Sequence, residues 1–147
     1  MALADLSDEM HLDGWTFIRL KDIQAVDLDP DVECFPTRAV RLRGQWPPTN
    51  PCPDVAVLDD VVSLVTTVRD LSPLVTVHRE FSRPDACWIG AVTDIDERRL
   101  WLHQVDPDAE WGRKLRQKDL DDLTRIQVGG AYEEARALVA GPRPASD

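Results

Sequence analysis

Five short runs in the C-terminal half alternate apolar and polar residues, and this period of two constrains the fold more than any other feature. The runs are Leu74–Glu80, Cys87–Asp94, Arg99–Val105, Arg113–Lys118 and Thr124–Gly129. Such alternation is typical of β-strands with one buried face. Short turn-forming segments connect the runs, which predicts consecutive antiparallel strands. Because curling removes exposed strand edges, we expect these five strands to form one small barrel.

Two helices are predicted beside these strands. Residues Leu58–Leu71 place apolar side chains at helical spacing, with Asp59 and Asp60 near the start and Pro73 after the end. Residues Tyr132–Val139 form a short amphipathic run that is positioned to cap the barrel. The predicted class is therefore α+β, mainly β, with flanking short helices. A length of 147 residues favours one compact unit.

Two segments one hundred positions apart have nearly the same pattern: Leu20–Val26 reads LKDIQAV and Leu120–Ile126 reads LDDLTRI. A helix-like run follows each of them, which is Phe35–Leu42 in the first case. The similarity predicts a degenerate strand-turn-strand-helix repeat, although seven-residue patterns of this kind also arise by chance. The first copy lacks strands, so we expect it to lean on the complete copy or on another chain. The predicted parts are an incomplete repeat at 1–43, a proline-rich connector at 44–57, and a helix with a barrel at 58–147.

Charge and cysteine content restrict the function classes. The net charge is −10, and residues 1–70 carry 13 acids against 6 bases. This charge repels phosphate backbones, so a protein partner, basic in character, is favoured over nucleic acid. Cys34, Cys52 and Cys87 show no CxxC spacing and follow no secretory leader, which predicts free thiols in a reducing cytosol. The apolar stretches are too short to cross a bilayer, so no membrane association is expected.

The run Ile89–Leu102 resembles the bent second and third strands of Sm-like and other SH3-like small barrels. The residues that carry this resemblance are Gly90, Val92, Ile95, Asp96, Leu100 and Leu102. PRC-type barrels show a similar Gly-x-Val before an acidic turn, and the chain is also similar to uncharacterised bacterial proteins with two half-repeats. The resemblance covers residues 74–128 and implies a five-stranded barrel with an incomplete N-terminal half-repeat. For Sm-like proteins it also implies RNA binding, but no asparagine follows Asp96 in the Sm-like pattern.

Metal sites and catalysis are weaker interpretations of the same residues. His78, His103 and Glu80 lie on predicted strands and could together bind zinc, although the usual ligand spacing is missing. The acidic turns Asp27–Asp31 and Asp106–Glu110 resemble calcium loops without the glycine and glutamate that such loops require. We therefore predict no metal and no cofactor. No catalytic residues are predicted, and an enzyme with a site between the repeats is a lesser alternative.

Aromatic and basic side chains are the candidate contacts for a partner. Small barrels often use exposed rings to bind extended peptides, but tryptophans can equally seal the junction between half-repeats. The basic run Arg113–Lys118 suits an acidic partner or the acidic half of a second copy, or simply protects a sheet edge. The predicted partner-binding residues are Trp15, Trp101, Trp111, Arg113, Lys114 and Arg116. We expect a non-catalytic, cytosolic protein-interaction module of adaptor or immunity type, able to form a homodimer, with an Sm-like RNA-binding protein as the alternative.

Overall fold

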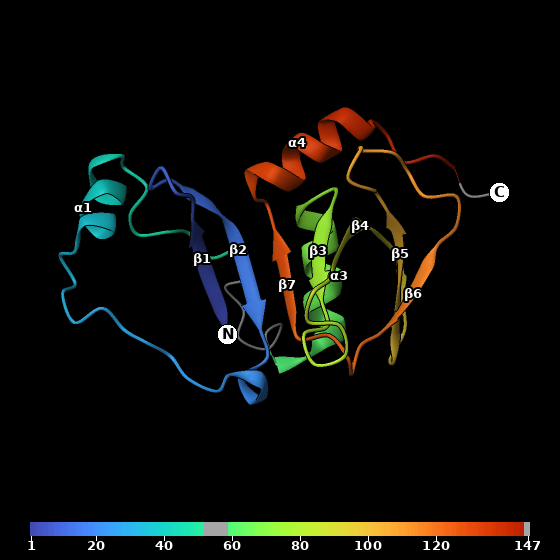
Figure 1. Cartoon of the computed structure of the whole chain (residues 1–147), viewed down its shortest axis with the longest axis horizontal. Helices are drawn as coiled ribbons and strands as arrows, with labels where there is room; N and C mark the ends of the chain where they lie inside the picture. The colour runs from blue at the N-terminus through green and yellow to red at the C-terminus, as the bar shows by residue number, and fades with distance from the viewer. Residues whose placement is uncertain (52–58, 146–147) are drawn as a thin grey trace.

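The computed structural model describes residues 1–51 and 59–145. Its strands form one antiparallel sheet of seven strands in the order β1-β2-β7-β3-β4-β5-β6 (Figure 1). The strands are β1 (Ala2–Leu6), β2 (Leu12–Ile18), β3 (Val75–His78), β4 (Cys87–Ile95), β5 (Arg99–Gln104), β6 (Arg116–Asp119) and β7 (Arg125–Val128). The helical elements are the 3-10 turn η1 (Leu20–Asp22) and the helices α1 (Phe35–Leu42), α3 (Val61–Leu71) and α4 (Ala131–Ala140).

The predicted class, α+β and mainly β, is confirmed. Each of the five predicted C-terminal strands overlaps an observed strand, and helices occupy the three predicted helical runs. The Asp60 carboxylate caps α3 by accepting hydrogen bonds from the backbone N–H groups of Val62 and Ser63, and the helix ends two residues before Pro73. Leu58 and residues 52–57 of the predicted connector lie outside the described residues.

The sheet is not closed into the predicted five-stranded barrel. β1 and β6 are its two end strands, and no pairing joins them in the described part of the chain. β7 already pairs with β3 on one side and with β2 on the other, so it has no free hydrogen-bonding edge left for β6. The N-terminal hairpin of β1 and β2 therefore extends the sheet. The first segment contacts the second by direct pairing of β2 with β7.

The two similar segments share a turn. The backbone N–H of Ile23 donates to Leu20 O over 3.2 Å, and the backbone N–H of Leu123 donates to Leu120 O over the same distance. Both segments therefore close the same four-residue turn, as the common leucine and acidic residues suggest.

The predicted strand-turn-strand-helix repeat nevertheless fails after this turn. Ile126 enters β7 and is 3% exposed, whereas Val26 lies in an irregular segment and is 59% exposed. The expected second strand of the first copy is absent from residues 23–34. The physical reason is that β2 already occupies the position beside β7, so the segment after η1 cannot pair with β7.

The sheet is covered on both faces. The main core packs α3 against the strands through Val65 and Val68, together with buried residues of β2, β3, β4, β5 and β7. A smaller core lies on the opposite face, where Leu74, Ile89 and Val105 pack against α4. α1 lies at the far end of the molecule from β5 and β6 (Figure 1). The two cores fix the C-terminal strands between α3 and α4.

β4 is strongly bent. Lys118 on β6 pairs with Leu100 on β5, and Leu100 pairs with Ile95 at the end of β4. The amine of Lys118 nevertheless lies 3.6 Å from the ring centroid of Trp88, near the start of β4. A straight strand would separate Trp88 from Ile95 by about 23 Å, farther than a lysine side chain reaches. The first part of β4 must therefore fold over the sheet toward β6.

Gly90 and a bulge produce this bend. A Cβ atom at Gly90 would lie 2.3 Å from the backbone oxygen of His103 on β5, so a side chain at this position has no space. The register of β4 against β5 also shifts between Val92 and Asp94, and such a bulge increases local twist. Close backbone approach and a bulge together turn β4 out of the plane of a flat sheet.

We predict that Gly90→Ala destabilises the fold by about 1–3 kcal/mol, because the added methyl group overlaps the backbone of β5. Gly112→Ala is the matched control, since its Cβ would lie 3.4 Å or more from any neighbour and its cost should stay within about 0.5 kcal/mol. Urea unfolding measures both variants. Equal stability of the two variants would contradict the bend described here.

Candidate functional site

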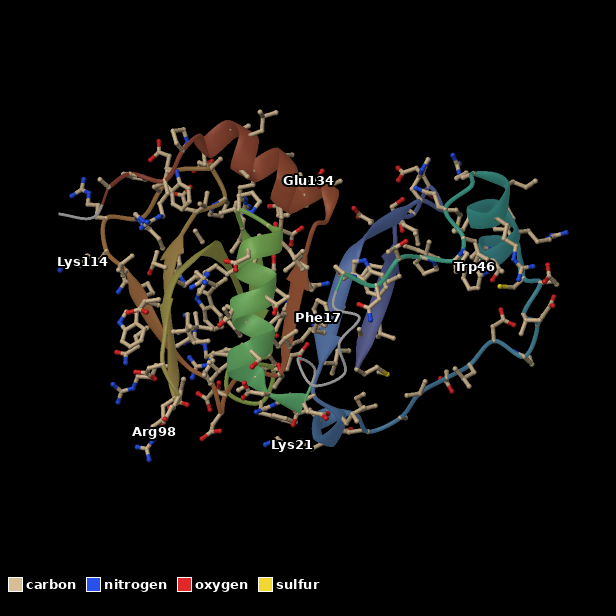
Figure 2. The ribbon with its side chains drawn as sticks, turned by 180° about the vertical axis from the view of Figure 1, so that it is seen from behind. Phe17, Lys21, Trp46, Arg98, Lys114 and Glu134 are labelled. Carbon is tan, nitrogen blue, oxygen red and sulfur yellow. The ribbon has the colours of Figure 1, made fainter. Side chains whose placement is uncertain are left out.

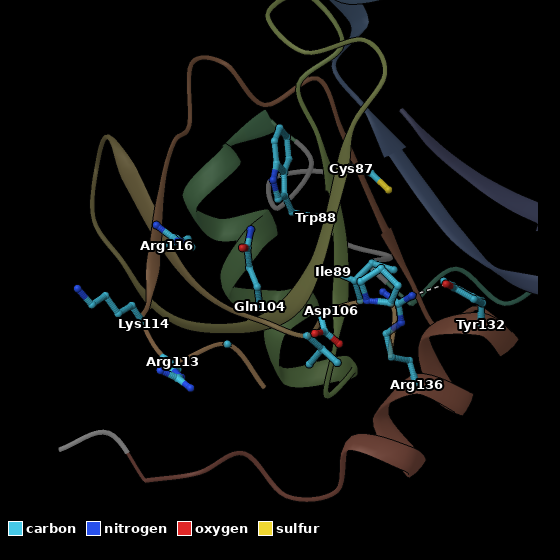
Figure 3. A pocket seen from close by; sticks show the side chains of 13 residues that line it. Cys87, Trp88, Ile89, Gln104, Asp106, Arg113, Lys114, Arg116, Tyr132 and Arg136 are labelled. Atoms are coloured by element: carbon cyan, nitrogen blue, oxygen red, sulfur yellow. Dashed lines mark hydrogen bonds between the residues drawn. The ribbon is translucent and has the colours of Figure 1, made fainter. Parts of the chain in front are cut away.

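The bend of β4 opens a cavity of about 780 Å³ between β4, the end of β5, the start of β6 and α4. This volume falls in the range of ordinary ligand pockets. Trp88 and Gln104 line its inner part, with Arg113, Lys114 and Arg116 along one side (Figure 3). Tyr132 and Arg136 of α4 lie on the other side (Figure 3). We call this cavity the cationic pocket.

The charges of the cationic pocket are unbalanced. Four cationic side chains line it, against the single carboxylate of Asp106. Within the described residues, the four cations form no ion pair with any carboxylate, and Arg136 instead donates to the hydroxyl oxygen of Tyr132. Other arginines of the chain are neutralised, for example Arg125 by Glu80 over 2.9 Å. The pocket is thus a concentrated positive region in a chain with a net charge of −10.

A buried lysine extends this positive region beyond Trp88. Lys118 is only 7% exposed, and its amine lies over the Trp88 ring. The guanidinium carbon of Arg79 lies 5.8 Å from the centroid of the same ring. The indole therefore contacts two cations, an arrangement that its negative face favours electrostatically.

Burial lowers the pKa of Lys118 from its ordinary value of 10.5 to about 8, and the positive charges of Arg79, Arg116 and Arg83 add to this effect. Each of these influences disfavours the charged amine. Lys118 is consequently the most destabilised cation around the pocket. It becomes neutral at a much lower pH than an exposed lysine does.

Gln104 adds a second unsatisfied donor. Its side-chain nitrogen is buried and has no hydrogen-bond acceptor among the described residues. Gln104 lines the pocket together with Trp88, and Figure 3 shows the side chain of Gln104 directed toward Trp88. A buried amide nitrogen without an acceptor is costly, so this atom suits an acceptor supplied from outside the chain.

The predicted basic residues lie at this site, whereas the predicted tryptophans do not. Arg113, Lys114 and Arg116 line the pocket, although the first two precede β6 instead of lying within it. Trp15 packs half-buried against the main core. The indole N–H of Trp111 donates to the backbone oxygens of residues 140 and 141, and the ring packs in the smaller core. Both rings are therefore packed within the fold.

Trp101 lies half-buried on β5, paired with Asp94 of β4 and Gln117 of β6, and outside the pocket wall. Sequence reasoning missed Trp88, Gln104, Lys118 and Arg136 as site residues. The sequence contained a signal for two of these residues, Trp88 and Lys118. Trp88 has the same phase as Val92 before the bulge, and Lys118 has the same phase as Leu120, which predicts inward-facing side chains.

The predicted zinc ligands are not brought together. His78 contacts the side chains of Gln127 over 2.7 Å and Arg125 over 3.2 Å, while Glu80 pairs with Arg125. His103 contacts the backbone oxygen of residue 112 over 2.6 Å. Burial lowers the pKa of His78 despite its hydrogen bond to Gln127. In the described ranges, no group of three or more His, Cys, Asp or Glu side chains is arranged to bind a metal ion.

The acidic turns use their carboxylates to cap their own backbone. The Asp106 carboxylate accepts hydrogen bonds from the N–H groups of Asp108 and Glu110, and Asp29 accepts one from the N–H of Asp31. These are local turn contacts of the kind that aspartate commonly makes. They account for the acidic patterns at Asp27–Asp31 and Asp106–Glu110 without a bound ion.

Comparison of the chain with protein-family models, with curated proteins and with solved structures finds no match in any of the three. The assignment of a function therefore depends on the chemistry of the cationic pocket alone. Among the helices of the described residues, none is long and apolar enough to cross a membrane.

The pKa of Lys118 gives a direct test of its burial. A folded-state pKa of about 8 in place of 10.5 means that folding disfavours the charged amine by on the order of 3 kcal/mol. The unfolded state binds this proton more tightly, so the penalty is complete below pH 8 and disappears as the pH rises toward 10.5. We predict that Lys118→Met is more stable than the natural chain by about 1–3 kcal/mol at pH 7, with a smaller difference at pH 10.

Denaturant unfolding at both pH values measures this difference, and Lys114→Met is the matched control because Lys114 is exposed. The control should change stability little at either pH. A destabilised Lys118→Met protein, or a difference that does not depend on pH, would contradict a buried and unpaired amine at this position.

Proposed function

We propose that this chain is a non-catalytic, cytosolic protein-binding module of adaptor type that binds an acidic, extended segment of its partner in the cationic pocket. The observation that carries the proposal is the group of four unpaired cations around one cavity, opposed by a single carboxylate. Carboxylate side chains complement arginine in both charge and geometry. The sequence favoured a basic partner on overall charge, whereas the local charge of the pocket favours an acidic one.

The shape of the pocket supports an extended ligand. Arg113, Lys114 and Arg116 lie on one side of the cavity, and Arg136 comes from α4 on the other (Figure 3). A segment with several carboxylates can contact both sides at once. Trp88 and the apolar side chain of Ile89 also line the cavity and suit the apolar residues of such a segment.

A short acidic segment fits the charge of the whole chain better than RNA does. The net charge of −10 repels a long polyanion at a distance, because repulsion accumulates over every phosphate. A segment of a few residues interacts mainly with the nearby cations, since other charges are screened beyond roughly 10 Å. The alternative of an Sm-like RNA-binding protein is therefore tested together with peptide binding.

Binding is also better supported than nucleophilic catalysis at this pocket. Cys87 lines the pocket and is the strand partner of His78. Both ring nitrogens of His78 are engaged by Gln127 and Arg125, so the imidazole is not directed at the thiol. A cysteine nucleophile needs such a base within hydrogen-bond reach.

The chain itself contains a segment of the required kind. Residues 27–33 carry four carboxylates, are exposed and form no regular structure. This segment precedes α1, at the opposite end of the molecule from Lys114; Figure 2 shows Trp46 and Lys114 at these two ends. It therefore suits the pocket of a second copy, and homodimerisation through complementary charges is a corollary of the proposal.

We predict that a peptide with the sequence of residues 27–33 binds the chain in isothermal titration calorimetry, and that binding weakens as salt is added. The double variant R113A/R116A should weaken binding roughly tenfold, because it removes two unpaired cations of the pocket. The control double variant K21A/R98A changes the net charge equally at exposed sites outside the pocket, and should bind as the natural chain does.

The same titration includes a peptide in which asparagine and glutamine replace the acids, and a single-stranded RNA of the same length. The neutral peptide should not bind. Tighter binding of the RNA, or equal loss of binding in both double variants, would overturn the proposal in favour of nucleic acid or of nonspecific attraction, respectively.

A further inference from the structure

Three side chains near Trp88 carry a donor without an acceptor in the described part of the chain: Lys118, Gln104 and, through its Nε, Arg79. The Lys118 amine forms neither a hydrogen bond nor an ion pair with any described residue, and its recorded contact is the Trp88 ring. The side-chain nitrogen of Gln104 is buried and likewise without an acceptor in the described part of the chain. Trp88 is common to both, because it lines the pocket with Gln104 and lies under the amine of Lys118.

The charged groups that act electrostatically on Lys118 are all arginines. Arg79 and Arg83 come from the end of β3 and the loop before β4, and Arg116 comes from β6. Arg79 is in turn paired with the carboxylate of Asp122. A buried charge normally requires a counterion, so this cluster is incomplete without an anionic ligand.

We propose that the Lys118 amine and the Gln104 amide form an inner subsite of the cationic pocket that binds one carboxylate beside Trp88. The inference rests on the proposed function, because the carboxylate is supplied by the acidic segment. Arg113, Lys114 and Arg116 attract the segment at the pocket wall, and the inner subsite selects one side chain that enters beside the indole. The flexible four-carbon stem of lysine allows the amine to move from the ring face to this carboxylate.

The subsite makes binding sensitive to pH in the neutral to alkaline range. The charged amine attracts a carboxylate, and the neutral amine does not. The arginines that face Lys118 stay charged throughout this range, so the amine is the group that changes. A bound carboxylate in turn raises the pKa of Lys118 above about 8, since an opposite charge favours the protonated form.

Acetate is the simplest probe of this subsite. The chain has three lysines, Lys21, Lys114 and Lys118, so the carbon resonances next to their amines can be followed separately by NMR and assigned with K114M and K118M. Acetate titration at pH 6.5 should move the Lys118 resonance, with about tenfold weaker binding at pH 9.5. Stronger movement of Lys21 or Lys114, or equal affinity at both pH values, would overturn the subsite.

Inorganic phosphate at the same ionic strength tests the ligand class. Weaker binding of phosphate than of acetate supports a carboxylate subsite, and tighter binding of phosphate overturns that assignment. Gln104→Leu provides an independent variant, because it removes the amide donor and leaves every charge in place. This variant should weaken acetate binding several-fold.

Failure of the inference can be separated from failure of the proposed function. If the acidic peptide binds the natural chain and K118M equally well, the inner subsite is wrong and the protein-binding function stands. If acetate binds at Lys118 but no acidic peptide binds, the subsite stands and the proposed partner class is wrong. Weaker peptide binding in both K118M and Q104L, with K114M retaining part of the affinity, supports both.

Discussion

The bend of β4 is the constraint on which the candidate site depends. Gly90 allows the backbones of β4 and β5 to approach so closely that no side chain fits between them. The start of β4 then lies over the sheet, and Trp88 reaches a lysine two strands away. Without this bend, the cations of β6 would be an ordinary charged edge. With it, they become the wall of a cavity that also includes residues of α4.

Acidic and basic side chains are distributed differently over the molecule. Several acidic side chains lie in exposed turns, where they cap backbone groups. The cations around Trp88 are gathered and unpaired, and one of them is buried. Proteins commonly retain such unfavourable groups where they act, because optimal stability and function compete at the same residues. Lys118 is the clearest example in this chain.

Sequence patterns predicted the strands and helices better than they predicted closure of the sheet or the surroundings of the site residues. Period-two runs located all five C-terminal strands. Closure was predicted wrongly, because no local pattern reveals that β2 occupies the free edge of β7. The basic run identified Arg113, Lys114 and Arg116 as members of one site, whereas Trp88 and Lys118 meet only through the bend of a strand. A contact made across two strands depends on three-dimensional curvature that residue spacing does not encode.

The pairing of β2 with β7 has a consequence for how the chain is made. Trp15 lies opposite Val128, so one edge of β2 finds its partner only after nearly all other strands exist. Closing so long a loop comes late in folding. During translation, one edge of the β1–β2 hairpin therefore stays unpaired until β7 is synthesised. In that time it can pair with other nascent chains. The hairpin of β1 and β2 completes its pairing only after β7 is made, and the speed of elongation sets how long its edge stays open.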